Sequence, residues 1–259
     1  MTNNSAQKMM SGWGGYPAKK VNIIYPTNLN QILIEIKKSE LIARGNGRAY
    51  GDSAINEKNT INMKYFNHIL SFDDKLGILV AESGVLLEDI INTFLPKGWF
   101  PYVTPGSKFV TVGGLLAADV HGKNHHKDGT FRNFVEWFEI IDSKGEIKKC
   151  SKNENKDLFE WSIGGMGLTG IIIRAAIKLR PVETCWIKQK IYVAENIDQT
   201  LDLFEKSMDA TYSVAWINST KDGSNIGQSL VILGEHATLD DLNKKIHSNP
   251  LRLKKNKMN

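Results

Sequence analysis

The hydrophobic pattern of the first ~180 residues alternates between short β-branched runs and short stretches with apolar residues at helical spacing. The β-branched runs predict strands over residues 20–25, 41–43, 61–63, 69–72, 78–81 and 170–179, and a hairpin over residues 134–141 and 146–150. Helical spacing predicts a helix opened by Pro26 and Thr27, and helices over residues 83–95 and 157–162. Because these elements do not follow a regular strand–helix–strand order, the pattern predicts an α+β fold.

The pattern changes after Pro181. Strands are predicted over residues 187–193, 212–217 and 228–233, with an amphipathic helix over residues 198–208. Thr238, with Asp241 three residues later, has the spacing of a capping box and predicts a last helix that carries Leu242 and Ile246. We expect a domain boundary near Val182, followed by a unit with few core positions and no obvious closing strand.

Composition places the chain among ordinary globular proteins. It has 259 residues, 41% of them hydrophobic and 24% charged, which suits one large domain or two unequal ones. Cys150 and Cys185 are its cysteines, which predicts free thiols in a reducing compartment. The N-terminal residues show no apolar signal core, and no apolar run approaches the length of a membrane span. These features predict a cytoplasmic protein without a transmembrane segment.

The net charge of +5 is concentrated near the C-terminus. From Lys244 onward the chain carries basic residues and no acidic residue. This segment is either a solvated tail or a surface that contacts phosphorylated lipids at a membrane. Nucleic-acid binding is disfavoured, because no basic motif interleaved with aromatic residues occurs.

A glycine-rich stretch, ARGNGRAYGDSA at residues 43–54, follows a predicted strand. A dinucleotide fingerprint would need a third glycine at Tyr50 and a helix afterwards, and the GK[ST] ending of a phosphate-binding P-loop is also missing. The stretch predicts a turn whose exposed amides bind an anion, with Arg44 or Arg48 adding charge, and the alternative is a plain glycine turn.

Two further glycine loops occur in the same unit. PGSKFVTVGGLLAADVHG, residues 105–122, again removes bulk where a backbone could approach a flat or phosphorylated ligand. In residues 163–179, Gly165, Gly167 and Gly170 match the dinucleotide pattern formally, but they follow a predicted helix and lead into a strand. We interpret this third loop as close packing or as a wall against a ligand.

The segment HGKNHH, residues 121–126, leaves three interpretations open. His121 and His125 have the spacing of two metal ligands on a helix, but no carboxylate or cysteine accompanies them and Lys123 and Lys127 would repel a dication. We therefore expect no metal. The remaining interpretations are imidazoles hydrogen-bonded in a turn and a polar cluster that lines a reactive pocket.

The motifs SGWGGYP (residues 11–17), ARGNGRAYGDSA, PGSKFVTVGG, HGKNHH and GGMGLTGIIIRA occur in an order that resembles FAD-linked oxidases of the vanillyl-alcohol-oxidase type. The resemblance covers nearly the whole chain. It implies a PCMH-type FAD-binding domain of two α/β subdomains over residues 14–182. An incomplete α+β substrate (cap) domain would follow over residues 183–259.

The resemblance also implies site residues. Tyr50 and His121 would face the flavin and the substrate as catalytic candidates, and Lys123 and Trp216 would lie near the sugar-phosphate end. Many relatives attach FAD covalently through a histidine at the place of Arg48, so non-covalent FAD is expected. The implied FAD contacts are Ala43, Arg44, Gly45, Asn46, Gly47, Arg48, Ala49, Tyr50, Gly51, Asp52, Ser53, Gly106, Thr111, Val112, Gly113, Gly114, Ala118, Asp119, Val120, His121 and Ile172.

The activity implied by the resemblance is oxidation of a secondary hydroxyl of a sugar, most specifically the 2-hydroxyl of a polyprenyl-phosphate ribose. A short-chain reductase partner would complete an epimerisation to arabinose for the cell envelope. Alternatives are an aldonolactone or alditol oxidase and an inactive flavin-binding module. Since the family's substrate domain continues further and returns a lysine and a tyrosine to the site, we expect a fragment or one half of a split enzyme, cytoplasmic or peripheral at the inner membrane face.

Overall fold

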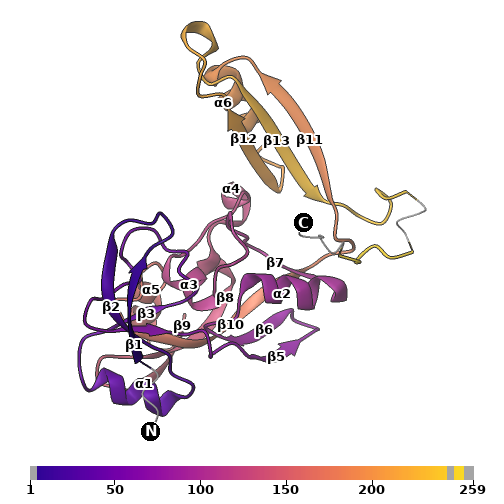
Figure 1. Cartoon of the computed structure of the whole chain (residues 1–259). Helices are drawn as coiled ribbons and strands as arrows, with labels where there is room; N and C mark the ends of the chain where they lie inside the picture. Colours follow the sequence, from indigo (N-terminus) through magenta and orange to yellow (C-terminus); the bar gives the residue numbers. More distant parts are fainter. Residues whose placement is uncertain (1–4, 244–247, 254–259) are drawn as a thin grey trace.

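The computed structural model describes residues 5–243 and 248–253, which form three β-sheets with short helices packed against them (Figure 1). The first sheet, in the order β1-β2-β4-β3, contains β1 (Ser5–Ser11), β2 (Ala18–Ile24), β4 (Thr60–Asn62) and β3 (Ile42–Arg44). β4 lies parallel to β2 and β3, while β1 is antiparallel to β2. The helix α1 (Leu29–Ile36) begins at Asn28, whose side chain accepts a hydrogen bond from the Gln31 amide.

The second sheet is antiparallel and is built around its long strand β10. Its strands, in the order β5-β6-β10-β8-β9 with β7 also paired to β10, are β5 (Ile69–Asp73), β6 (Ile78–Glu82), β10 (Ile171–Pro181), β8 (Val135–Ile141), β9 (Ile147–Ser151) and β7 (Trp99–Pro101). The helices of this region are α2 (Leu87–Phe94), α3 (Val112–Ala117), α4 (His125–Asp128) and α5 (Lys156–Ser162), with 3-10 turns at Leu95–Lys97 and Phe131–Phe134.

β10 is buried on both faces, which explains its almost continuous apolar sequence. Ile172 and Ala175 belong to the core that this sheet shares with α2, α3 and α5. Ile171 and Ile173 point the other way and pack with Ile32 of α1, in a core shared with the first sheet. Alternation along one strand therefore joins the first two sheets into one packed body.

The third sheet is formed by residues that follow Val182. Its antiparallel strands are β11 (Ile187–Ala194), β13 (Ser229–His236) and β12 (Tyr212–Ile217), with a 3-10 turn at Gly223–Asn225. The helix α6 (Ile197–Lys206) covers one face of this sheet, where Thr200 Oγ1 and Ser229 Oγ lie 2.7 Å apart. In Figure 1 the sheet stands above the rest of the chain, with α4 at its foot.

The α+β fold class is confirmed, and most predicted elements occur within a few residues of their expected bounds. The predicted first residue of the next helix, Ser83, is wrong, because α2 begins at Leu87. The Ser83 amide bonds to Ile173 O at 2.9 Å, and Val85 O accepts from the Val112 amide, so this stretch continues sheet-like pairing.

The helix predicted from Thr238 is wrong within the described residues. The capping contact itself forms, since Thr238 Oγ1 lies 3.2 Å from Asp241 Oδ2. The same carboxylate also binds the ammonium of Lys188 on β11, and the following residues form a turn. Ile246 and most of the basic C-terminal segment lie outside the described residues.

Candidate functional site

The first two glycine loops pack directly on each other. A Cβ at Gly45 would lie 2.3 Å from Thr111 Oγ1, so a residue with a side chain at this position would force the loops apart. Asn46 Nδ2 donates to Phe109 O at 2.9 Å, and the guanidinium of Arg48 lies between the rings of Trp13 and Phe109, 4.5 and 5.6 Å from their centres. The two loops therefore form one continuous surface.

The third glycine loop is fastened to the helix that follows the second. The amides of Gly164 and Met166 donate to Leu116 O and Ala117 O at 3.0 and 2.8 Å, at the end of α3. Arg132 reinforces this junction, because its guanidinium binds both Glu160 on α5 and Ile163 O. All three loops are thus held around α3.

Together the loops enclose a cavity of about 910 Å³, counting its open mouth. Its lining residues include Ala43, Gly45, Asn46, Gly47, Arg48, Ala49, Ser53, Thr111, Gly113, Gly114, Ala118, Val120 and Ile172. Each of these residues is among the cofactor contacts implied by the family resemblance.

The first loop borders this cavity and carries main-chain amides that have no protein partner among the described residues. In the described part of the chain, no main-chain hydrogen bond is donated by residues 46–53. Gly47, with φ of +69°, bends the loop in a conformation that favours glycine. Arg48 Nε and Ser83 Oγ are buried and have no partner among the described residues. Unpaired donors at a concave, glycine-rich surface suit an anionic group.

The amides of the second loop are used differently. The Gly113 amide donates to Ser83 O at 2.8 Å, and the Gly114 amide donates to Thr111 Oγ1 at 3.2 Å. Glycine at residue 113 permits close packing, since a Cβ there would lie 2.9 Å from Ser83 Cβ. The first loop therefore contributes donors, while the second contributes an uncrowded wall.

Several residues implied as cofactor contacts are not among the described residues that line the cavity. Arg44 is buried, and its guanidinium donates to Ser11 O at 2.8 Å, so it ties the loop to β1. Burial lowers the pKa of Arg44. Asp119 accepts from Arg132 Nε at 3.3 Å, and Val112 lies in the core. The others outside the lining are Tyr50, Gly51, Asp52, Gly106 and His121.

Other residues line the cavity that the sequence reasoning did not name as contacts: Ala54, Met63, Ser83, Val110, Ala117, Met166, Gly167 and Gly170. Met166, Gly167 and Gly170 belong to the third loop, for which a wall against a ligand was one of the two interpretations. Met63 and Ser83 carried no signal, because each follows an ordinary strand and reaches the cavity through strand pairing.

The candidate catalytic residues do not line the cavity, but each directly follows a residue that does: Tyr50 follows Ala49, and His121 follows Val120. His121 directly follows Val120, is exposed, and has its ring 5.5 Å from that of His125. Tyr50 is 76% exposed, two residues after Arg48. Lys123 is joined to β12 through its carbonyl oxygen, which accepts from the Ser213 amide at 2.9 Å. Trp216, 67% exposed, lies further along that strand.

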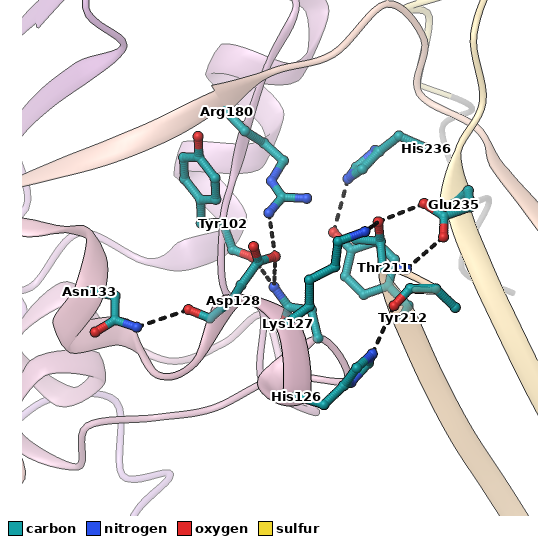
Figure 2. A network of polar contacts seen from close by, with 12 residues as sticks. Tyr102, His126, Lys127, Asp128, Asn133, Arg180, Thr211, Tyr212, Glu235 and His236 are labelled. Atoms are coloured by element: carbon teal, nitrogen blue, oxygen red, sulfur yellow. Dashed lines mark hydrogen bonds and ion pairs between the residues drawn. The ribbon is translucent and has the colours of Figure 1, made fainter. Parts of the chain in front are cut away.

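The rest of the HGKNHH segment forms a polar network with the third sheet (Figure 2). His126 Nε2 donates to Ala210 O at 2.8 Å, and Lys127 Nζ donates to Asp209 O at 2.8 Å. His126 lies in α4 and bonds to a carbonyl far away in the sequence, so this contact is not the local turn that was one of the open interpretations. Among the described residues, no group of three His, Cys, Asp or Glu side chains comes together as a metal site.

A second part of the network joins Tyr212 and His236 of the third sheet. The Tyr212 hydroxyl and His236 Nε2 share a hydrogen bond of 2.9 Å, and the His236 ring lies 5.5 Å from Phe100. Burial, assisted by the charge of Arg180, lowers the pKa of His236 to about 4. Burial also raises the pKa of Tyr212. Both side chains are therefore neutral at physiological pH.

Residues 24–151, which hold the first two glycine loops and α3, match the FAD binding domain family. The chain belongs to this family, with a PCMH-type FAD-binding domain. It is 33% identical over 255 residues to the decaprenylphosphoryl-beta-D-ribose oxidase of Mycolicibacterium smegmatis, in an alignment that covers 95% of this chain and 55% of that protein. The chain thus spans about half the length of this relative.

Other relatives match smaller parts of the chain. Cytokinin dehydrogenase 5 of Arabidopsis thaliana is 27% identical over 193 residues, covering 66% of this chain and 34% of that protein. A D-lactate dehydrogenase of Anaerostipes hadrus is 32% identical over 126 residues, covering 47% and 26%. The domain family indicates a flavin cofactor. The unpaired amides, the glycine-lined cavity and the adjacent guanidinium fit its diphosphate.

In the part of the chain that the structure describes, no helix combines the length and apolar character needed to cross a bilayer.

Proposed function

We propose that this chain is the FAD-binding part of an oxidoreductase that oxidises a secondary hydroxyl of a sugar, specifically the 2-hydroxyl of a ribose carried on a polyprenyl phosphate. The observation that carries the proposal is the cavity shared by three glycine loops, with unpaired amides on one side. Residues 14–182 act as the cofactor domain, and residues from 183 onward begin the substrate domain.

The cofactor is held without a covalent bond. The amides of residues 46–49 and the Arg48 guanidinium bind the diphosphate, and Thr111, Gly113 and Gly114 form the wall beside it. Arg48 occupies the place from which a histidine would attach the flavin, and a guanidinium does not form that bond. FAD, when bound, supplies the acceptor for a hydride from the substrate carbon.

The chain's own residues bind the sugar and take its proton. His121, next to the cavity wall, is the candidate base that takes the hydroxyl proton on an imidazole nitrogen, with Tyr50 as the other candidate. Lys123 binds the phosphate by charge, and Trp216 packs against the sugar. These roles follow from the family resemblance and from the closeness of residues 120–123 to the cavity.

The choice of a lipid-linked ribose rests on the Mycolicibacterium smegmatis relative, whose name states a decaprenylphosphoryl-ribose oxidase. A 2-keto sugar product would pass to a short-chain reductase for net epimerisation. A polyprenyl carrier is consistent with a protein that works at the inner face of a membrane.

The first test is whether the purified chain binds FAD. We expect yellow protein, or uptake of added FAD with quenching of flavin fluorescence, and release of intact FAD on denaturation. Flavin that remains attached to the denatured chain would contradict non-covalent binding. Colourless protein that takes up no FAD would overturn the proposal altogether.

The second test is anaerobic bleaching of the flavin absorbance by substrate. A polyprenyl-phosphate ribose should bleach it, whereas free alditols and aldonolactones should not. Bleaching by an alditol or an aldonolactone would favour the corresponding oxidase instead.

A second candidate is a flavin-binding module that has no activity of its own. It is favoured by the described geometry, in which neither His121 nor Tyr50 lines the cavity. Yellow protein that no sugar bleaches would support this candidate, and recovery of bleaching on addition of a polypeptide that supplies the remainder of that relative would return the assignment to the sugar oxidase.

A further inference from the structure

The helix α4 is one of the places at which the cofactor-binding body meets the third sheet (Figures 1 and 2). The helix is one turn long and follows Val120, which lines the cavity. It therefore lies between the proposed cofactor site and the proposed substrate domain.

The contacts from α4 to the third sheet end on main-chain atoms. His126 Nε2 donates to Ala210 O, and Lys127 Nζ donates to Asp209 O, each at 2.8 Å. Both carbonyls lie in the loop between α6 and β12, so their position is set by the backbone of that loop. A carbonyl oxygen only accepts hydrogen bonds, which makes both side chains donors.

A second contact made by Lys127 extends into the sheet. Its Nζ lies 3.4 Å from Thr211 Oγ1, while that hydroxyl donates to Glu235 Oε2 at 2.6 Å. The Thr211 amide also donates to Glu235, at 2.6 Å. Lys127 is thereby connected through Thr211 to β13, the central strand of the sheet.

On its other side, α4 is anchored in the cofactor-binding body. Asn124 is fully buried, and its Nδ2 donates to both Tyr102 O and Asp128 Oδ2 at 2.7 Å. Arg180 of β10 forms an ion pair with the same Asp128 carboxylate, and its guanidinium lies 4.4 Å above the ring of Tyr102. The helix is thus fixed before it reaches the sheet.

We propose that His126 and Lys127 are positioning residues, which hold the third sheet in a fixed orientation on the cofactor-binding body by binding the carbonyls of the loop between α6 and β12. They act through the backbone of that loop and do not line the cavity among the described residues. This inference goes beyond the proposed oxidation and does not depend on it, because the orientation of the sheet is a property of the chain alone.

The amide of Ser213 reports the docked state directly. Its acceptor is Lys123 O, at 2.9 Å, on the other side of the junction. Amides of the central strand β13, such as those of Val231 and Ile232, lie between β11 and β12 and report whether the sheet itself is folded. Hydrogen exchange at these positions therefore separates undocking from unfolding.

The experiment measures amide hydrogen exchange by NMR in the full chain with FAD added, for the wild type and the variants. In the double variant His126→Ala with Lys127→Met, we expect exchange at Ser213 to accelerate about tenfold or more, as loss of two hydrogen bonds implies, with Val231 and Ile232 unchanged. His126→Gln with Lys127→Arg should restore the wild-type rate, because both replacements keep a donor.

His125→Ala is the matched control. This residue lies on the same helix, and its side chain contacts the ring of His121. Ser213 should therefore exchange at the wild-type rate in this variant. An unchanged rate at Ser213 in the double variant would overturn the proposal. Faster exchange throughout the sheet would also overturn it, since the side chains would then support folding of the sheet rather than its placement.

Discussion

Gly45 and Thr111, which are far apart in the sequence, meet where the first two glycine loops touch. The space at Gly45 is so limited that a Cβ would lie 2.3 Å from Thr111 Oγ1, which is shorter than the contact distance of non-bonded heavy atoms. By contrast, a Cβ at Gly106 would meet nothing within 4 Å, although the family resemblance implied both glycines as cofactor contacts. The two positions therefore have different roles at the residue scale.

Gly45→Ala should weaken FAD binding by about tenfold or more, because the first loop must shift from Thr111 and its donors then lose their alignment. Gly106→Ala should bind FAD as the wild type does. Fluorescence titration with FAD measures both dissociation constants. Equal effects of the two substitutions would show that the contact between the loops does not control the cavity.

The two cysteines differ in environment. Burial raises the pKa of the Cys150 thiol to about 11, and this side chain is fully enclosed in the core. Since the thiolate is the reactive form, Cys150 should resist a thiol reagent in the native protein at pH 8, while the partly exposed Cys185 should react. Mass spectrometry after a timed reaction would identify the modified residue, and rapid modification of Cys150 would contradict its burial.

At the scale of elements, α3 illustrates how a helix forms without a helical signal. Its sequence VGGLLA contains two glycines in the first turn, which disfavour a helix. Thr111 compensates, because its hydroxyl accepts from the Gly114 amide and its side chain is almost fully buried. Leu115 and Leu116 then pack into the core. Capping and tertiary packing together outweigh propensity.

Thr111→Ala should lower the free energy of unfolding by about 1 kcal/mol through loss of the cap. Thr111→Ser keeps the hydroxyl and should retain most of that stability. Urea denaturation of both variants measures the difference. If serine destabilised the protein as much as alanine does, packing of the threonine methyl group would be responsible instead.

At the scale of the whole molecule, the junction between the cofactor-binding body and the third sheet contains neutral, half-buried groups. His236 has a pKa of about 4 in the folded chain, below its ordinary value of 6.5. The unfolded chain therefore takes up a proton at this site before the folded chain does. The free energy of unfolding therefore keeps its full value above pH 6.5 as far as His236 is concerned. It decreases as the pH falls through 4.

We expect the free energy of unfolding to decrease by roughly 1–3 kcal/mol between pH 7 and pH 4 because of this histidine. Urea unfolding across this range should show a smaller decrease for His236→Gln, which does not titrate and can still bond to Tyr212. The exposed His125, changed to glutamine, serves as the control and should follow the wild type. A parallel pH dependence of His236→Gln and the wild type would contradict the assignment.

The local pattern predicted much of the fold because most strands and helices are amphipathic by themselves. The strand over residues 171–181 was visible as an unbroken β-branched run, and its burial on both faces explains that run. β1, β7 and α4 carried little signal, since β1 is largely exposed and the other two are only three and four residues long. The helix expected at Thr238 shows the reverse case, in which a local cap formed without a helix.

The part of the candidate site that lies in glycine loops and family motifs was predicted from the sequence. The sequence by itself determined the strand and helix pattern, the three glycine loops and the resemblance to flavin oxidases, because these depend on residue type and local spacing. Only the tertiary structure decided that Met63 and Ser83 reach the cavity, that Arg44 and Asp119 turn to protein partners, and that His126 and Lys127 bind the third sheet. Those contacts join residues distant in the chain, and their partners are fixed by sheet pairing and core packing rather than by any local pattern.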